Sequence, residues 1–253
     1  MIFIKPVTFL YRNHFPSAFS KNYLTIYIYR QKNIDRLCNN LYNYEYFFNK
    51  ISEGFSMATQ VITLNCPTCG GTVNVSQQCC EYCGNPVLIS TFQSVIDMPA
   101  PTISKHVSSY RQALAADPEN KALNTSVAMC FLKLKLYDQA LSAFEKAMEF
   151  NFDNSEVFFY AAVCLLGGKI PFLHLRPTID KILSYIESAL MIEPRGIYYY
   201  FLAYIKHDYF KRKFLNVTPN YSQHLQQALA AGVTESDIAQ LYSILGTARP
   251  AGL

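Results

Sequence analysis

The chain has 253 residues, with 22 Lys and Arg against 18 Asp and Glu, which gives a formal net charge of +4. Residues 1–56 hold seven of the basic and three of the acidic residues, so the remainder carries fifteen of each and is neutral. A neutral body argues against bulk electrostatic attraction to nucleic acid. No uninterrupted apolar run approaches the ~20 residues of a membrane-spanning helix, so no transmembrane segment is expected.

Residues 1–56 differ in composition from everything that follows. They contain seven Tyr, seven Phe and seven Asn and show no helical periodicity. Because the composition changes abruptly at Met57, we expect that residue to be the native start and residues 1–56 to be translated upstream sequence. The competing interpretation is an arm that binds a membrane surface or a partner through interleaved cations and aromatics. A poorly ordered extension is compatible with both.

Two C-x-x-C pairs, Cys66/Cys69 and Cys80/Cys83, stand ten residues apart within residues 57–90. Four thiolates suit one tetrahedral zinc ion, and a unit this short needs a metal to hold it together. Four protein ligands leave no position for water, so the predicted zinc is structural rather than catalytic. Redox-active thiols are the alternative, although no βαβ pattern surrounds either pair.

Other residues of this segment fit the same interpretation. Gly70 and Gly84 each follow a pair and can adopt positive φ, while residues 72–75 and 87–89 are typical of short strands. Cys79 adjoins Cys80 and is expected to be a bystander, although it could replace Cys80 as a ligand.

The pattern CPTCGG…CEYCG, over residues 62–90, resembles the bacterial zinc-ribbon family. The resemblance implies two rubredoxin-like knuckles around a structural zinc. Residues 91–104 follow, with Pro99 and Pro101, and we expect a linker there because proline interrupts both helices and strand ladders.

Helical periodicity begins at residue 105 and continues to residue 246. The clearest unit spans residues 121–154, with expected helices over 121–134 and 138–150 joined by a short turn. Its small and large apolar residues occur where two helices must pack closely, at Ala128, Ala140, Phe144 and Ala147. This unit resembles the 34-residue tetratricopeptide repeat (TPR), which implies a right-handed superhelix of helix pairs.

The following units match the repeat less closely. Residues 155–194 form a second unit with an insertion over 167–177, and residues 197–231 form a third with a stretched basic turn at 211–213. Thr234 is expected to cap a last helix over 235–245, which would cover the end of the array, and residues 247–253 form a tail. The sequence therefore predicts a mainly α protein, a TPR-like α-solenoid with a small N-terminal β zinc ribbon.

Two groups of residues are candidate binding sites. The repeat register implies an apolar concave face that could hold a peptide; it is lined by Thr125, Met129, Leu132, Phe159 and Val163. The alternative is that these residues pack against the linker, the ribbon or a neighbouring helix. The second group is a basic cluster suited to an acidic partner, RNA or lipid head groups, unless it is only a solvated surface; it comprises Lys206, His207, Lys211, Arg212 and Lys213.

No nucleotide-binding loop, nucleophile elbow or metalloprotease motif occurs in the sequence, and the five His residues show no ligand spacing. We therefore predict a non-enzymatic scaffold that binds a protein or peptide partner in the cytoplasm, where thiols stay reduced. The alternative is a nucleic-acid-binding accessory factor that uses the ribbon and the basic cluster. Against it, the ribbon carries only Glu81 as a charged residue between Cys66 and Pro86.

Overall fold

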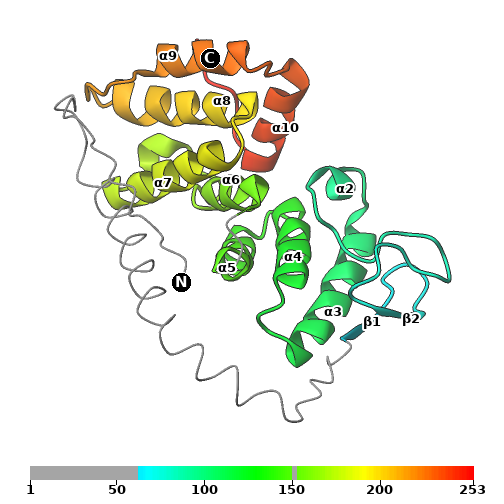
Figure 1. Ribbon diagram of the computed structural model, residues 1–253. Coiled ribbons are helices and arrows are strands. Elements are labelled where there is room, and N and C mark those ends of the chain that lie inside the picture. Colours follow the sequence, from blue (N-terminus) through cyan, green and yellow to red (C-terminus); the bar gives the residue numbers. More distant parts are fainter. Residues whose placement is uncertain (1–61, 150–152) are drawn as a thin grey trace, which may run out of the picture. The chain divides into compact units, whose positions relative to one another are not determined.

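The computed structural model describes residues 62–149 and 153–253 (Figure 1). The predictions for residues 1–56, including a native start at Met57, lie outside the described residues. Among the described residues, no helix combines the length and the apolarity needed to span a bilayer.

The segment after residue 61 is a small hairpin. Strand β1 (Thr63–Asn65) pairs antiparallel with β2 (Thr72–Asn74), and Leu64 lies opposite Val73, with both side chains buried. The expected strand over 87–89 is wrong. Only an isolated bridge, Cys79 to Pro86, forms before it, because the backbone of 87–89 turns toward the helices instead of toward another strand.

Helices begin inside the segment that was expected to be a linker. Helix α2 (Gln93–Ile96) is a single turn, and α3 (Ala100–Ala116) follows Pro99 directly. The two prolines do not interrupt α3, since Pro99 is its N-cap and Pro101 lies in its first turn, where no backbone N–H is required. The proline density therefore marks a helix start rather than a spacer.

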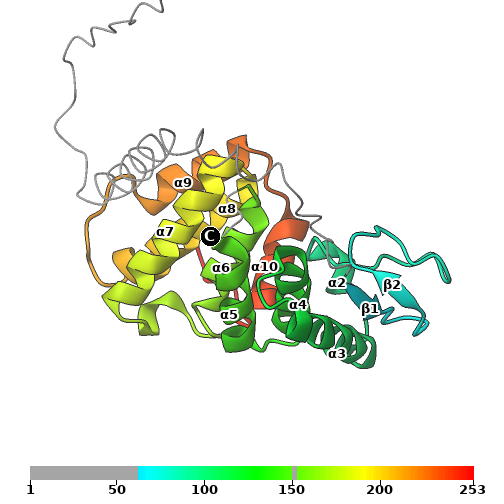
Figure 2. The same ribbon diagram turned by 60° about the horizontal axis from the view of Figure 1, so that its bottom comes forward.

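The rest of the described chain is a succession of helices in which each helix from α3 to α8 contacts the next (Figures 1 and 2). They are α4 (Lys121–Lys133), α5 (Tyr137–Met148), α6 (Ser155–Cys164), α7 (Arg176–Ile192), α8 (Gly196–Ile205), α9 (Tyr221–Ala230) and α10 (Glu235–Leu245). A short 3-10 turn, η1 (Pro171–Leu173), precedes α7. The molecule is mainly α, and this arrangement of sequential antiparallel pairs confirms the predicted α-solenoid.

Small residues let the first pair approach closely. Ala128 on α4 and Ala140 on α5 are fully buried, and Phe144 and Ala147 are buried beside them. A side chain larger than alanine at either crossing would push the two backbones apart. The small and large apolar residues of this unit therefore pack α4 closely against α5, as the sequence predicts.

The connection after α8 differs from the expected turn. The helix continues as a π-helix, η2 (Lys206–Lys211), before the chain reaches α9. This winding draws His207, Asp208, Tyr209 and Phe210 into the interior. Residues that were expected in a solvated loop therefore belong in part to the core.

The last helix is placed differently from an end cap. Thr234 forms a capping box with Asp237, and Gly246 ends α10 in the left-handed conformation, as the sequence suggests for a helix over 235–245. However, α10 turns back and contacts α6 and α8, as both ribbon views show. The Tyr137 hydroxyl on α5 also donates to the carbonyl of Ile244, at 2.7 Å.

The hairpin is docked on α3 and α4 through polar contacts. The Tyr110 hydroxyl donates to the Val87 carbonyl at 3.0 Å, and Ser109 donates to the Asn65 carbonyl. The Ser126 hydroxyl accepts from the Ile89 N–H at 3.0 Å. Because the Tyr110 hydroxyl hydrogen is committed to Val87, His106 Nδ1, 3.2 Å away, must be the donor to the Tyr110 oxygen.

Tyr110→Phe should therefore lower the free energy of unfolding by about 1–3 kcal/mol, because it leaves the buried Val87 carbonyl without its donor. Urea unfolding followed by circular dichroism measures the change. Tyr82→Phe, which removes a hydroxyl from a residue that is 66% exposed, is the matched control and should have little effect. Equal stability of the two variants would contradict the docking role of Tyr110.

Candidate functional site

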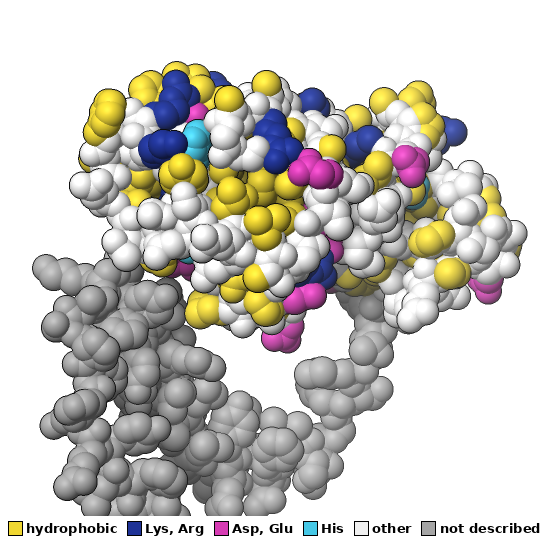
Figure 3. Space-filling model, turned by 90° about the horizontal axis from the view of Figure 1, so that it is seen from above, with side chains coloured by type: hydrophobic (Ala, Val, Ile, Leu, Met, Phe, Trp, Pro, Cys, Tyr) yellow, Lys and Arg dark blue, Asp and Glu magenta, His cyan; other side chains and the backbone are white. Residues whose placement is uncertain are grey.

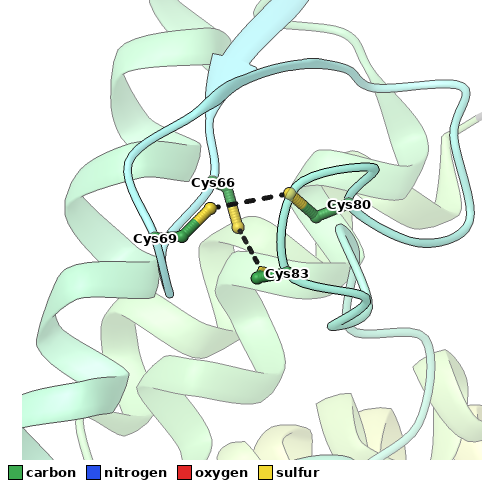
Figure 4. A group of neighbouring side chains, drawn as sticks. All are labelled: Cys66, Cys69, Cys80 and Cys83. Atoms are coloured by element: carbon green, nitrogen blue, oxygen red, sulfur yellow. Dashed lines mark hydrogen bonds between the residues drawn. The ribbon is translucent and has the colours of Figure 1, made fainter.

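The four cysteines of the two pairs form a cluster (Figure 4). Their Sγ atoms all lie within 4.8 Å of one another, with Cys66 to Cys83 at 3.7 Å and Cys69 to Cys80 at 3.6 Å. A tetrahedral ion with metal–sulfur bonds of ~2.3 Å requires sulfur–sulfur edges of ~3.8 Å. The cluster therefore has the size of a tetrahedral metal site, and its sulfurs are too far apart for disulfides.

Two equivalent backbone turns build the cluster. In the first, Cys66 N–H donates to Gly71 and Gly70 N–H donates to the Cys66 carbonyl, both at 2.8 Å. In the second, Cys80 N–H donates to Asn85 and Gly84 N–H to the Cys80 carbonyl, again at 2.8 Å. Gly70 and Gly84 have φ of +81° and +72°, which lets each turn close tightly.

The surroundings of Cys83 favour its ionised form. Hydrogen bonds from the backbone N–H and then from the side-chain amide of Asn85 lower the pKa of the Cys83 thiol to about 6. The amide nitrogen lies 3.4 Å from the sulfur. Because a metal ion binds the thiolate form of cysteine, these hydrogen bonds favour a ligand role for Cys83.

Cys79 does not join the cluster. It is exposed, and its backbone bridges to Pro86. The four residues that come together are those predicted as metal ligands, Cys66, Cys69, Cys80 and Cys83. Cys66 and Cys80 are buried, so the protein already shields half of the set from solvent.

The five residues predicted to line an open groove are buried instead: Thr125, Met129, Leu132, Phe159 and Val163. None is more than 5% exposed, so their side chains do not form a free surface. Helix α2 covers part of this face, with the Phe92 ring 5.2 Å from that of Tyr160, and α10 covers another part through α6 and α8. The open groove is thus corrected to a concave face filled by the chain's own helices.

A cleft remains where α2, α4 and α10 meet. It has a volume of about 450 Å³, and its lining comprises Phe92, Gln93, Ile96, Leu132, Lys133, Lys135, Ser236, Ala239, Gln240, Ser243 and Ile244. The Lys133 ammonium group donates a hydrogen bond to the Ile96 carbonyl, which connects α4 to α2 at one edge of the cleft. A smaller cleft of about 170 Å³ lies between α6, α8 and α10, beside the Arg195–Glu156 ion pair of 2.8 Å.

The residues of the predicted basic cluster lie close together, but their side chains have partners within the protein. Lys206 is half-buried and donates to the Pro219 carbonyl at 2.6 Å, and Arg212 pairs with buried Asp208, also at 2.6 Å. His207 is buried beside Tyr221. Lys211 and Lys213 lie over aromatic rings, 4.6 Å from the Tyr221 centroid and 3.9 Å from that of Tyr209. The π-helix that arranges them has no signature in the sequence pattern.

No protein-family model and no curated protein matches this chain. Among solved structures, one of MamA from AMB-1 is similar with a TM-score of 0.41 and 17% identity, covering 59% of this chain and 84% of that one. A MamA structure from MSR-1 gives a TM-score of 0.40 and 16% identity over 55% of this chain and 82% of that one. Similarity at this level establishes neither a family nor a function.

The cysteine cluster should hold about one equivalent of metal per chain. Cys66→Ser and Cys80→Ser should each abolish stoichiometric binding and lower the melting temperature, because metal binding contributes to folding. Cys79→Ser is the matched control and should retain the metal. Elemental analysis of the purified protein measures content and identity together. Loss of metal in Cys79→Ser, with retention in Cys80→Ser, would contradict the ligand set.

Acid should destabilise the region around α9. Burial, and then the charge of Lys206, lower the pKa of His224, whose Nε2 accepts from the Lys206 ammonium at 2.9 Å. The unfolded chain therefore binds more protons than the folded one. This histidine's stabilisation is present above the unfolded pKa of ~6.5 and is lost as pH falls through the lower folded pKa.

His224→Gln should reduce the fall in melting temperature between neutral and mildly acidic pH. Some acid sensitivity should persist, because burial also lowers the pKa of His106 and His207. An unchanged pH profile in the variant would contradict this assignment.

Proposed function

We propose that the chain is a non-enzymatic scaffold that binds a protein or peptide partner and carries one structural zinc ion. The observation that carries the proposal is the cleft between α2, α4 and α10, which remains where the concave face is otherwise filled. The metal has a supporting role, since its four ligands hold the hairpin from which α2 follows.

The identity of the metal is inferred from its donors. Four thiolates at tetrahedral spacing suit zinc, and together they fill its coordination shell. No fifth protein ligand or open position is needed. A zinc ion bound in this way stabilises the fold and takes no part in a reaction.

The lining of the cleft supports peptide binding better than chemistry. Its floor is apolar, with Phe92, Leu132 and Ile244 buried, and its rim is polar, with exposed Lys135 and Ser243. None of its lining residues is Asp, Glu, His or Cys. In the smaller cleft, Glu156 is paired with Arg195 at 2.8 Å. The arrangement suits an apolar side chain beside a carboxylate on the partner.

The nucleic-acid alternative has weaker support. The ribbon has no Lys or Arg between Cys66 and Pro86, and two cations of the basic cluster are held by Pro219 and Asp208. We also propose a reducing compartment, the cytoplasm, because the seven described cysteines are all free.

A photo-crosslinking amino acid at Ser243, on the rim of the cleft, should give a discrete protein adduct in cells. The same amino acid at Ala230, an exposed α9 position outside the cleft, is the matched control and should give none. Adding Ala239→Arg to the Ser243 probe should reduce the adduct by about fivefold or more, because the new side chain obstructs the cleft.

Equal adducts from both positions would contradict binding in the cleft. A Ser243 adduct that disappears on nuclease treatment would instead favour the nucleic-acid alternative.

A further inference from the structure

Two long connections come together at one end of the helix pairs. One runs between α6 and α7 and includes η1; the other runs between α8 and α9 and begins with η2. They occupy the equivalent turn of successive pairs, and η1 and η2 are in contact. The Phe172 N–H donates to the buried Asp208 carboxylate at 2.8 Å, which fixes one connection to the other. In repeat proteins, insertions that share a face often form the binding face.

These connections expose a concentration of large apolar side chains. Leu173, Leu175, Phe214 and Leu215 are 65%, 77%, 93% and 42% exposed, and they are half of the eight exposed large hydrophobic residues in the described part of the chain. None of the other four lies in these two connections: Leu136 precedes α5, Met191 and Leu229 lie on α7 and α9, and Tyr82 lies on the cysteine hairpin. Since single exposed leucines are ordinary, it is their clustering that requires an explanation.

The backbone holds Phe214 outward at some cost. Its φ is +56°, in the left-handed region that non-glycine residues seldom occupy. The turn is fixed by the Phe214 N–H donating to Lys211 and the Leu215 N–H donating to Phe210, at 3.0 and 2.8 Å. Glycine or asparagine would fit this turn with less strain, so a protruding phenylalanine here is better explained by a contact outside the chain than by folding.

Cations surround the apolar side chains and are held in place by aromatic rings. Arg212 lies 4.4 Å from the Phe172 centroid and Arg176 lies 4.9 Å from that of Phe210. Lys211 and Lys213 lie over Tyr221 and Tyr209. At the upper left of the face drawn in Figure 3, Lys and Arg side chains lie among hydrophobic ones. We name this set the interfacial patch: Leu173, Leu175, Arg176, Lys211, Arg212, Lys213, Phe214 and Leu215.

We propose that the interfacial patch binds the surface of an anionic phospholipid bilayer. Its apolar side chains protrude from two turns, so they can enter the boundary between head groups and acyl chains. Arg176 and Arg212 are paired with Asp180 and Asp208, and Lys211 and Lys213 are the cations that match negatively charged lipid head groups. RNA would account for the cations and for one aromatic ring, but leucine offers no face for base stacking. The patch is separate from the cleft of the proposed scaffold and binds a different class of partner.

Vesicle sedimentation of the full chain tests the proposal. Vesicles of phosphatidylcholine and phosphatidylglycerol at a 3:1 ratio should bind the protein, and pure phosphatidylcholine should bind it about tenfold less. Raising the salt from about 0.05 M to about 0.5 M should weaken the binding, because the charges are exposed.

Paired variants separate the apolar from the electrostatic contribution. Leu175→Ser with Phe214→Asn should reduce partitioning by about tenfold or more, and asparagine keeps the left-handed turn. Met191→Ser with Leu229→Ser removes two exposed apolar side chains elsewhere, 66% and 64% exposed, and should bind normally. Lys211→Gln with Lys213→Gln should lose roughly 20-fold, whereas Lys105→Gln with Lys146→Gln should lose little. Arg212 is left intact because it neutralises buried Asp208.

The absence of tryptophan from the chain permits a direct probe of insertion. Phe214→Trp should shift its fluorescence to the blue and be quenched by brominated lipids on binding anionic vesicles, and Leu229→Trp should not. Circular dichroism and the melting temperature confirm that each variant is folded.

Three outcomes would overturn the proposal: equal binding to both kinds of vesicle, equal loss in patch and control variants, or salt-sensitive binding to single-stranded RNA with none to vesicles. The last would assign the patch to nucleic acid. Because no variant lies in the cleft, these results do not depend on the scaffold proposal.

Discussion

The fold requires that α6 and α8, the first helices of two successive pairs, are covered by other helices on both sides. Helices α6 and α8 are buried around almost their whole circumference, so a single row of partner helices cannot satisfy them. α7 and α9 cover one side, and α10 returns across the other. The concave face of this solenoid is therefore largely part of its own core, and a cleft remains at the corner near α2 and α4.

The cysteine hairpin is part of the same construction. Its hydrogen bonds to Tyr110 and Ser126 end on α3 and α4, so the small sheet is fixed to the helices by buried polar groups as well as by apolar contact. Such groups are costly when unpaired, which makes the relative placement of hairpin and helices specific. A metal ion bound by the four cysteines would therefore also help to fix the position of the first helices.

The sequence was most informative where the signal is local. Helix limits over 121–134 and 235–245 are close to those observed, and the spacing of the four cysteines identified the residues that cluster. Pro99 and Pro101 led to the wrong prediction of a linker. Proline interrupts the interior of a helix, but it is also common at the start of one, which is where these two residues lie. The groove was predicted open because the repeat register says which helix face looks inward, but not whether a distant segment such as α10 returns to cover it.

One sequence signal could have indicated that coverage. Apart from Ser155 and Glu156 in the first turn, residues 155–164 and 196–205 are apolar on every face, whereas a helix with one open face should show a polar stripe there. The cysteine cluster and the cleft are also close to each other along the chain. Only a short segment separates Cys83 from Phe92, whose ring packs on Tyr160, and Ile96 accepts from Lys133 at the edge of the cleft. The segment that follows the hairpin therefore contributes Phe92, Gln93 and Ile96 to the lining of the cleft, so loss of metal from the hairpin should disturb that lining.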